Sequence, residues 1–421
     1  MDFAIFRKGF KGVFGIIDLF MLNYIALLIP LFLGLIALEW WYSIKQNDRR
    51  YHAPNTVLNM AVGAIDQFGA LLYLLLLYMA LVFSQKHFQW LILPNDWRQW
   101  LLAFLSVDFV SYWYHRFSHR INLLWAGHVT HHSSSYFNLS NGFRTSPFQG
   151  LFRIPFWMIL PVFGFDPLVL VVTFKVIGLH DFFVHTSYIP KLGWLEWVIV
   201  TPSHHRVHHG KNEMYIDKNY GSALIVWDRM FGTYQEETEA VEYGITSKYE
   251  DDSPLHAIVF HFKQIIEQVR KTRGWLNKLK VLLMPPGWGV VYLDVAHVDI
   301  NGEKSTEKGV VYYAIWLLIT GVLGFVGILF SYAILPPFTV SYCFLLAVGN
   351  IVQSAILLNQ SETANFGFWE SFRLMGFGLF GYFLLETLIP LGYLVMGWIF
   401  ISGIGFAVLK SRYFGKKSQN N

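Results

Sequence analysis

The chain reads His115-Arg-Phe-Ser-His119, then His128-Val-Thr-His131-His132, and later His204-His205-Arg-Val-His208-His209. We call these stretches boxes one, two and three; they hold nine of the sixteen histidines. Neutral imidazole is the commonest protein ligand for transition metals. All the boxed histidines except His204 recur at i, i+3 or i+4, which places their rings on one face of a helix. Eight rings are too many for one tetrahedral ion, so the boxes predict a site for two metal ions.

One further histidine joins this predicted ligand set. His185 follows two apolar segments, 148–163 and 167–184, which a short turn separates. Such a hairpin returns the chain to the side it left, and we expect His185 to reach the boxes. The predicted metal ligands are His115, His119, His128, His131, His132, His185, His205, His208 and His209, of which the eight boxed residues are also the predicted catalytic residues.

The other histidines have different expected roles. His180 returns through the same hairpin, and His204 lies on a different helical face from His205, so ligation, orientation of a ligand and contact with substrate stay open for both. A lone histidine is more often packed or exposed than bound to metal. That interpretation applies to His52, His87, His256, His261 and His297.

The composition predicts a membrane protein. Hydrophobic residues make up 54% of the chain and charged residues 14%, against about 25% charged in a typical soluble domain. A helix needs about 20 apolar residues to cross a bilayer. Apolar segments lie near 18–42, 58–83, 99–114, 148–163, 167–184, 311–333, 339–359, 372–388 and 390–409. The sequence therefore predicts an all-α, multi-pass integral membrane protein with a histidine-rich di-metal site at the cytosolic membrane face.

The segments suggest a division of the chain into five parts. We expect N-terminal transmembrane helices over 1–98, a histidine-box catalytic domain over 99–250 with its membrane hairpin at about 148–184, an amphipathic interfacial connector over 251–310, C-terminal transmembrane helices over 311–410 and a polar tail over 411–421. Within the connector, apolar residues recur at helical spacing from Pro254 to Arg273. A helix lying on the membrane and a helix packing on the polar domain fit this pattern equally well.

Charge and cysteine content exclude other classes of protein. The net charge is only +4, and the basic residues show no nucleic-acid-binding pattern. The single cysteine, Cys343, excludes intrachain disulfides and iron–sulfur clusters held by one chain. Basic residues gather around the boxes and in the tail, which places both on the cytosolic side. We expect the cytoplasmic membrane in a bacterium or the endoplasmic reticulum in a eukaryote; the orientation of the N-terminus stays open.

Two rival functions fit part of the pattern. A zinc protease needs His-Glu-x-x-His, but Arg116 stands where the glutamate would activate water. A metal transporter would use intramembrane ionisable groups, and Asp66 and Asp108 lie in apolar segments. The boxes lie at the membrane edge, which favours chemistry at a headgroup-proximal site. A transporter or a non-catalytic metal-binding membrane protein stays an alternative of another class.

Longer strings carry a family resemblance. They are Tyr112-Trp-Tyr-His-Arg, Leu124-Trp-Ala-Gly-His128, His131-His-Ser-Ser, Asn138-Leu-Ser, Thr201-Pro-Ser-His-His-Arg-Val-His-His-Gly210, Asp217-Lys-Asn-Tyr-Gly221 and Trp227-Asp-Arg-Met-Phe-Gly-Thr233. Over roughly 100–250 the chain resembles the membrane-bound fatty acid hydroxylase and sterol desaturase superfamily, and within it the alkylglycerol monooxygenase family. The chain departs from that family in two places: Arg120 stands in place of a glutamate, and Ser135 and Tyr136 stand in place of an acidic pair.

The resemblance implies an O2-dependent, non-haem di-iron monooxygenase that cleaves alkylglycerol-type ether lipids to a fatty aldehyde and a glycerol. Its implied cofactors are two iron ions, with zinc able to take the site on purification, O2, and tetrahydrobiopterin or another external reductant. Its implied partners are a membrane lipid and an electron-donor protein or diffusible reductant. Hydroxylation or desaturation of a sterol, carotenoid or fatty acyl chain stays the alternative within the superfamily.

Neutral ligands leave the metal charge uncompensated, so nearby carboxylates are expected to accept ring N–H bonds. Asp108 lies seven residues before His115, two turns along the same helical face. For Asp108 a helix–helix hydrogen bond is an equal alternative, and the other carboxylates also fit helix caps or loops. Arg144 and Arg206 are candidates to hold a substrate phosphate or to pair with these aspartates. The predicted residues around the ligands are Asp108, Asp181, His180, His204 and Asp228, with Asp217 as a further carboxylate.

Overall fold

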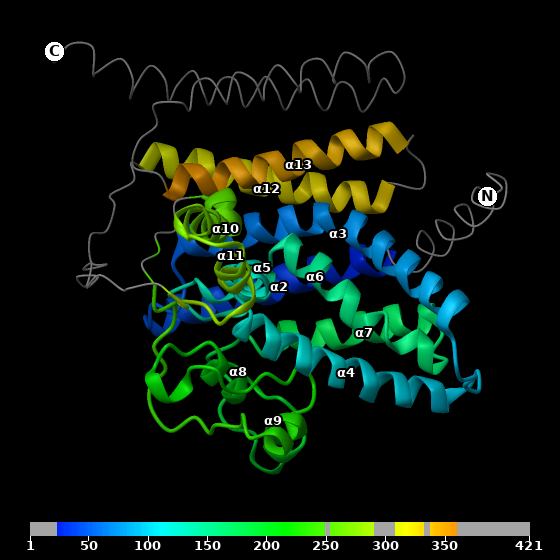
Figure 1. The fold of residues 1–421 in the computed structure, drawn as a ribbon. Coiled ribbons are helices and arrows are strands. Elements are labelled where there is room, and N and C mark those ends of the chain that lie inside the picture. The colour runs from blue at the N-terminus through cyan, green and yellow to red at the C-terminus, as the bar shows by residue number, and fades with distance from the viewer. Residues whose placement is uncertain (1–22, 248, 250–252, 290–307, 332–336, 360–421) are drawn as a thin grey trace. The chain divides into compact units, whose positions relative to one another are not determined.

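The computed structural model describes residues 23–247, 249, 253–289, 308–331 and 337–359. These residues belong to two compact units. The larger spans Leu35–Val298, and the smaller combines Met1–Gly34 with Asp299–Asn421. Helices are the regular elements in the described residues, with no β-strand among them (Figure 1). The predicted all-α class is confirmed for this part of the chain, while the predicted five-part division stays a prediction.

The larger unit contains long apolar helices and shorter polar ones. Its first helix, α2, begins in the smaller unit. The helices are α2 (Asn23–Gln46), α3 (Ala53–Phe88), α4 (Trp97–Arg120), α5 (Asn122–His132), α6 (Pro147–Trp157), α7 (Pro167–Phe183), α8 (Pro202–His208), α9 (Val226–Phe231), α10 (Pro254–Lys271) and α11 (Trp275–Leu283). Short 3-10 turns lie between them: η2 (Leu139–Phe143), η3 (Leu160–Phe163), η4 (Gly193–Trp197) and η5 (Glu213–Tyr215).

The chain reverses between α6 and α7, as the sequence predicts. Gly164 has a φ of +91°, and a Cβ there would lie 2.4 Å from the carbonyl oxygen of Leu91, so only glycine fits the turn. Asp166 then caps α7, because its carboxylate accepts hydrogen bonds from the backbone N–H groups of Leu168 and Val169. The reversal carries the chain back toward the boxes, and α7 ends just before His185.

The long helices form a body with the polar segments at one end. α3 packs against α6 and α7, and α4 packs against α7 and α5. The irregular chain that holds α8 and α9 lies beside the end of this body where α4 stops (Figure 1). Each box therefore meets the others where a long helix ends.

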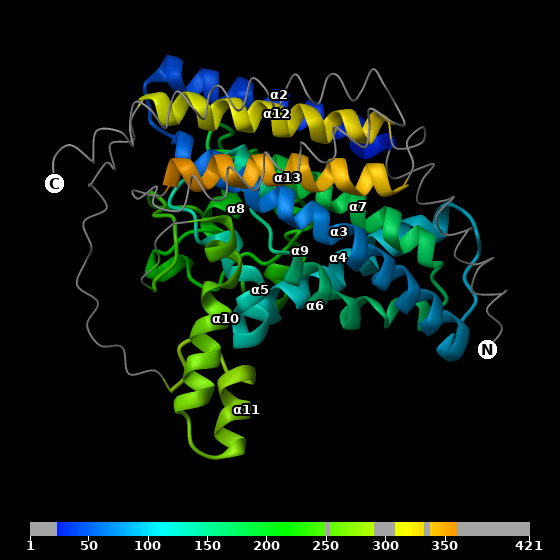
Figure 2. The ribbon, with the colours of Figure 1, turned by 90° about the horizontal axis from the view of Figure 1, so that it is seen from above.

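The amphipathic segment forms α10, and protein covers part of its apolar face. Ile258 packs with Val62 of α3, and Ile265 packs with Ala126 of α5 and Val281 of α11. Figure 2 shows α10 and α11 side by side, extending from α5. Packing on the folded unit accounts for these residues, while Leu255 and Ile266 are exposed, so a contact of α10 with the membrane stays a prediction.

Few described helices are long and apolar enough to cross a bilayer. Leu28–Gln46 passes this test, and the two halves of α3, Ala53–Ala70 and Leu72–Phe88, pass it together across a 41° bend. Two shorter apolar helical stretches, Val311–Phe325 and Cys343–Leu358, lie in the smaller unit. The multi-pass topology that the composition predicts is therefore a proposal.

The smaller unit contains the helical pair α12 (Lys308–Ser331) and α13 (Pro337–Asn359). The two helices approach closely at Gly321, where a Cβ would lie 2.7 Å from Ile351. The Ser354 hydroxyl on α13 donates to the carbonyl of Ala314 on α12 at 2.6 Å. The predicted apolar segments 372–388 and 390–409, the tail and His297 lie outside the described residues.

Candidate metal centre

Helix geometry places the rings of the three boxes. Box one lies in the last turn and a half of α4, and box two forms the end of α5. Box three lies in α8, with His209 as the C-cap residue. His185 lies two residues beyond α7. All nine predicted ligands are brought together, and they form two groups among the described residues.

We call the first group cluster 1. Its members are His115, His119, His128, His132 and His208, whose candidate ligand nitrogens all lie within 4.8 Å of one another. The Nε2 atom of His128 lies 2.9 Å from that of His115 and 3.0 Å from that of His132. The Nε2 atom of His119 is buried and has no hydrogen-bond partner.

The second group, cluster 2, consists of His131, His185, His205 and His209, within the same 4.8 Å limit. The Nε2 atom of His185 lies 2.9 Å from that of His205 and 3.2 Å from that of His131. The clusters adjoin, because the rings of His132 and His209 stack with centroids 4.4 Å apart.

The two clusters divide the boxes by helical spacing. Each i, i+4 pair enters one cluster: His115 with His119, His128 with His132, and His205 with His209. The remaining ring of box two, His131, enters cluster 2, and the remaining ring of box three, His208, enters cluster 1. Neighbouring residues on a helix point about 100° apart, so α5 and α8 each present rings to both clusters.

Backbone carbonyls fix the orientation of four rings. The Nδ1 atom of His115 lies 2.8 Å from the Tyr220 carbonyl oxygen, and that of His208 lies 2.9 Å from the Lys218 carbonyl. His131 faces the carbonyl of Arg144 at 3.2 Å, and His185 faces that of Asp181 at 2.5 Å. A carbonyl only accepts, so Nδ1 carries the proton and the Nε2 lone pair faces the cluster.

The Nε2 lone pairs converge within each cluster, which is the arrangement that a bound metal ion requires. Each Nε2 in these tautomers is an acceptor, so the short contacts between Nε2 atoms lack protons to bridge them. A cation at the centre of each cluster converts this repulsion into coordination. A ligand set made of imidazole nitrogens, without sulfur or oxygen ligands, suits iron, zinc or copper better than magnesium or calcium.

The electrostatic environment keeps the rings neutral. Burial first, and then repulsion between neighbouring rings, holds the pKa of six rings well below the ordinary value of 6.5. Burial lowers the pKa of His185 to about 4 and that of His208 to about 3. Burial also lowers the pKa of His119, against the opposing effect of Asp217. Neutral imidazole is the form that binds metals.

Two of the predicted carboxylates, Asp228 and Asp108, hold a loop rather than the imidazole rings. Asp228 accepts from the backbone N–H groups of Tyr220 and Gly221, both at 2.7 Å. Asp108 accepts from the N–H of Ala223 at 2.8 Å and from the Trp227 indole at 2.8 Å. Neither carboxylate accepts an imidazole N–H bond. The bond from Trp227 on α9 to Asp108 on α4 is the helix–helix hydrogen bond that was the equal alternative for Asp108. Both carboxylates hold the loop whose Tyr220 carbonyl orients His115.

The remaining predicted residues lie around the clusters in other roles. Asp181 offers its carbonyl, not its carboxylate, to His185. The His180 ring faces the Ser222 carbonyl at 3.1 Å and belongs to neither cluster. His204 also lies outside both, and its Nδ1 accepts from the Thr201 N–H at the start of α8.

Two polar groups close to the ligands were not predicted, and one of them, Gln149, contacts a ligand ring directly. The side-chain oxygen of Gln149 lies 3.1 Å from Nδ1 of His128, and its only sequence signal was a polar residue within an apolar segment. Glu39 on α2 accepts from the backbone N–H of Leu139 at 2.9 Å and from the hydroxyl of Thr186, the residue after His185. Nothing in the sequence pairs α2 with the boxes.

Neither arginine proposed for a substrate phosphate is available for one. Arg144 is fully buried and donates to the Thr130 carbonyl and to the side chain of Asn59. Arg206 forms a two-pronged ion pair with Glu237 at 2.8 and 2.7 Å. Both guanidinium groups hold loops near cluster 2.

The segment that contains both clusters matches a known protein family. Residues 100–233, which contain boxes one and two, His185 and box three, match the fatty acid hydroxylase family model. The alkylglycerol monooxygenase of Homo sapiens is 36% identical over 274 residues, covering 63% of this chain and 60% of that protein. The enzyme of the same name from Danio rerio is 36% identical over 296 residues, covering 67% and 65%.

The name of a bacterial relative refers to a different lipid. The ornithine lipid hydroxylase OlsE of Rhizobium tropici is 30% identical over 161 residues, covering 37% of this chain and 49% of that protein. The chain thus spans less than two thirds of the length of these relatives. No solved structure matches the chain.

Proposed function

We propose that this chain, whose residues 100–233 match the fatty acid hydroxylase family, is a membrane-bound non-haem di-iron monooxygenase that hydroxylates lipids. One observation carries the proposal: nine imidazoles, most of them buried, lie in two adjoining clusters and direct ligand nitrogens at two centres. Two iron ions with four or five imidazoles each satisfy those nitrogens. The predicted ligand set is therefore retained in full.

Bound iron would supply the reduction of O2 and the oxidation of an unactivated C–H bond, which no side chain can do. The chain's residues hold and orient the ligands. Carbonyls such as those of Tyr220 and Arg144 keep the metal-binding tautomer. Because all nine ligands are neutral, the positive charge is large, and Asp217 beside His119 offsets part of it.

We propose alkylglycerol-type ether lipids as the substrate, supported by the relatives named alkylglycerol monooxygenase. Hydroxylation of the carbon next to the ether oxygen forms a hemiacetal, which collapses to a fatty aldehyde and a glycerol. One atom of O2 enters the lipid and the other leaves as water, so two electrons and two protons are required. Tetrahydrobiopterin, another diffusible reductant or an electron-donor protein supplies the electrons.

The proposed site lies at the cytosolic face of a multi-pass membrane protein. The candidate span Leu28–Gln46 supports the membrane assignment, as do large apolar side chains exposed on the long helices. Leu72 on α3 is 59% exposed, Leu101 on α4 is 53% exposed and Val176 on α7 is 52% exposed. Exposed apolar faces of this kind suit contact with lipid.

A metal transporter or storage protein is the rival from another class. Transport requires that the ion leave its site, and four or five converging imidazoles, several of them held by backbone carbonyls, favour retention instead. Within oxygenase chemistry, a sterol, carotenoid or fatty acyl chain is the alternative substrate. The bacterial relative, named for an ornithine lipid, supports an alternative of this kind.

Two measurements test the proposal. Metal analysis of protein purified from iron-supplemented cells is expected to give about two metal ions per chain. Expression in a cell that contains ether lipids is expected to deplete alkylglycerols and to release fatty aldehyde in an O2-dependent manner. One ion or none per chain contradicts the di-metal site. Unchanged alkylglycerols with an altered sterol or acyl pool would replace the ether substrate with the alternative.

A further inference from the structure

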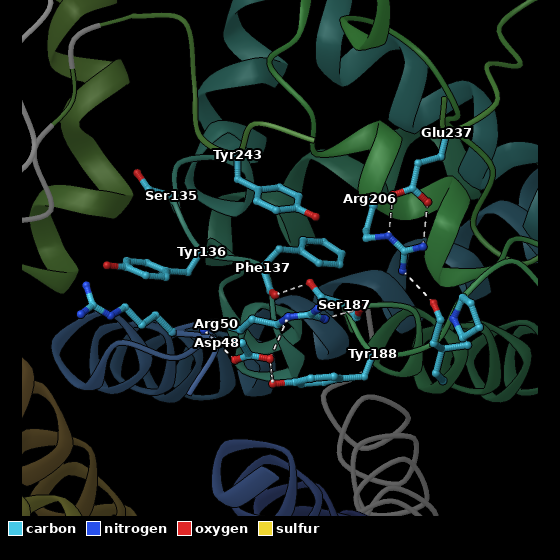
Figure 3. A pocket seen from close by; sticks show the side chains of 13 residues that line it. Asp48, Arg50, Ser135, Tyr136, Phe137, Ser187, Tyr188, Arg206, Glu237 and Tyr243 are labelled. Atoms are coloured by element: carbon cyan, nitrogen blue, oxygen red, sulfur yellow. Dashed lines mark hydrogen bonds and ion pairs between the residues drawn. The ribbon is translucent and has the colours of Figure 1, made fainter. Parts of the chain in front are cut away.

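A cavity of about 470 Å³ opens beside cluster 2 in the larger unit. This volume lies in the range of small-molecule sites. The segment after α2, the segment after box two and the segment after His185 supply most of the lining of the cavity (Figure 3). Its walls combine aromatic rings with charged groups, so an amphiphilic ligand fits it better than a wholly apolar one.

One wall of the cavity is also a wall of the metal centre. The ring of Phe137 stacks on that of Tyr243 with centroids 5.0 Å apart, and Figure 3 shows the two rings together in the cavity. The same Phe137 ring lies 5.2 Å from that of His209 and 5.7 Å from that of His185. A ligand in the cavity is therefore separated from cluster 2 by one aromatic side chain.

The charges that line the cavity do not all cancel. Arg206 is neutralised by Glu237, as Figure 3 shows. Arg50 is neutralised by Asp48, with 3.1 Å between Nε and the carboxylate, and its guanidinium lies over the Tyr188 ring. Arg49 is exposed, and no hydrogen bond or ion pair of its guanidinium is found among the described residues. One positive charge is left over at the cavity.

Arg49 lies in a turn with a left-handed backbone. Its φ is +55°, and that of Asn47 is +53°, both in the left-handed region. Asp48 holds this turn, because its carboxylate accepts from the Ser43 hydroxyl at 2.7 Å and from the Arg50 N–H at 3.2 Å. A residue other than glycine or asparagine in this conformation costs energy, which is consistent with a functional requirement for the side chain.

The cavity lies at the end of the candidate membrane span. Within α2, the stretch Leu28–Gln46 is long and apolar enough to cross a membrane. The residues that line the cavity begin two positions after it, at Asp48. Trp41 is 57% exposed and Lys45 follows it, a combination typical of the lipid–water boundary. A lipid headgroup at this level can enter the cavity while its chain stays in the apolar region.

We propose that this cavity binds the anionic headgroup of the lipid substrate, with Arg49 contacting a phosphate or carboxylate oxygen. The proposal rests on the proposed function and refines its substrate class, from neutral alkylglycerols to lipids with an acidic headgroup. Phe137 then lies between the bound headgroup region and cluster 2. The Arg206–Glu237 and Arg50–Asp48 pairs shape the cavity without competing for the anion.

Competition binding in nonionic detergent tests the proposal without requiring turnover. The labelled probe is a tritiated 1-O-alkylglycerol 3-phosphate. Its unlabelled form, the neutral 1-O-alkylglycerol with the same chain, and glycerol 3-phosphate serve as competitors. We expect the alkylglycerol phosphate to compete at least about tenfold better than the neutral lipid, because a charge-assisted hydrogen bond discriminates by that much or more.

Matched variants test whether Arg49 causes the preference for the acidic lipid. Asparagine and aspartate tolerate the left-handed backbone, so Arg49→Asn and Arg49→Asp change charge with little strain. We expect Arg49→Asn to reduce the preference to about twofold or less and Arg49→Asp to abolish it. Arg273→Asn removes an exposed arginine beyond α10 and is expected to leave the preference unchanged.

Several results overturn the proposal. They are equal binding of the neutral and acidic lipids by the unchanged protein, an unaltered preference in both Arg49 variants, or an equal loss in Arg273→Asn. If glycerol 3-phosphate competes as well as the lipid, the cavity binds a soluble phosphate instead. The same assay on His205→Ala separates the two proposals, because headgroup binding survives there even if no metal binds and no lipid is oxidised.

Discussion

Asp217 places a carboxylate oxygen 3.6 Å from the Nδ1 atom of His119. Its other oxygen accepts from Arg120 at 2.6 Å. Burial opposes ionisation of Asp217, but His119 and Arg120 lower its pKa to about 2, so the group is charged at neutral pH. Nε2 of His119, on the far side of the ring, is the buried nitrogen without a partner in cluster 1. Asp217 thus orients a candidate ligand and balances charge beside it.

Asp217→Asn tests this orienting role. We expect the metal in cluster 1 to be held about 10- to 100-fold less tightly, because the amide supplies no charge to balance the ion. The measurement is metal retained per chain during titration with a chelator. Asp96→Asn, which alters a helix cap remote from the boxes, serves as the control. Equal retention in Asp217→Asn and the unchanged protein would remove Asp217 from the metal site.

Single ligand substitutions in different clusters are expected to give separate losses. His208→Ala removes a ring from cluster 1 and His131→Ala removes one from cluster 2. We expect each variant to fall from about two metal ions per chain toward one, with product formation abolished. His180→Ala, which alters a ring outside both clusters, is expected to keep both ions. The ligand assignment fails if either cluster variant retains full metal content and normal turnover.

Glu39 is expected to stabilise the unit that contains cluster 2. Its buried carboxylate accepts from Tyr51, Thr186 and the Leu139 N–H. Glu39→Gln replaces one accepting oxygen with an amide NH2 group, which cannot accept a hydrogen bond from these donors. We expect a loss of about 2 kcal/mol in the free energy of unfolding. Thermal unfolding in detergent measures it, with the exposed Lys45→Gln on the same helix as the control. A melting temperature equal to that of the control would show that these bonds contribute little.

His261 predicts a dependence of stability on pH. Burial lowers its pKa to about 4, while the unfolded value is near 6.5. The ring is therefore neutral in the folded unit, and the unfolded state binds the extra proton between these values. The stabilisation is present above pH 6.5 and is lost as the pH falls toward 4, by about 1 kcal/mol per pH unit and about 3 kcal/mol at most.

Comparison with a variant isolates this contribution from those of the other buried histidines. His261→Gln keeps a donor for the Asn122 side-chain oxygen, which lies 2.8 Å from Nε2 of His261. We expect its unfolding free energy to fall less steeply than that of the unchanged protein between pH 6.5 and 4.5. Parallel profiles for the two proteins would assign the acid sensitivity to other groups.

Local periodicity predicted much of the fold and the site. The i, i+4 spacing of His115 and His119 fixes their common helical face wherever the helix lies, and the same holds for His205 and His209. The turn at Gly164 and Asp166 carries its own sequence signal, which is why the position of His185 could be anticipated. These features depend on residues close together in the chain.

Features that depend on distant segments could not be anticipated. The division of box two between the clusters depends on how α5 lies relative to α7 and α8, which spacing alone does not specify. Backbone carbonyls such as that of Lys218 are present at every residue, so no residue type marks the ones that orient rings. Asp108 shows the limit of facial arguments: it shares a helical face with His115, yet its carboxylate holds the loop at Ala223.

The sharing of α5 and α8 between the clusters has a consequence for the spacing of the two ions. His131 and His132 are adjacent along the backbone, as are His208 and His209, and in each pair one residue serves each centre. In the proposed di-metal site, the separation of the ions would therefore be set by the geometry of two short helices and not by flexible loops. We expect α5 and α8 to stay helical when a ligand binds, because unwinding either one would displace ligands of both centres.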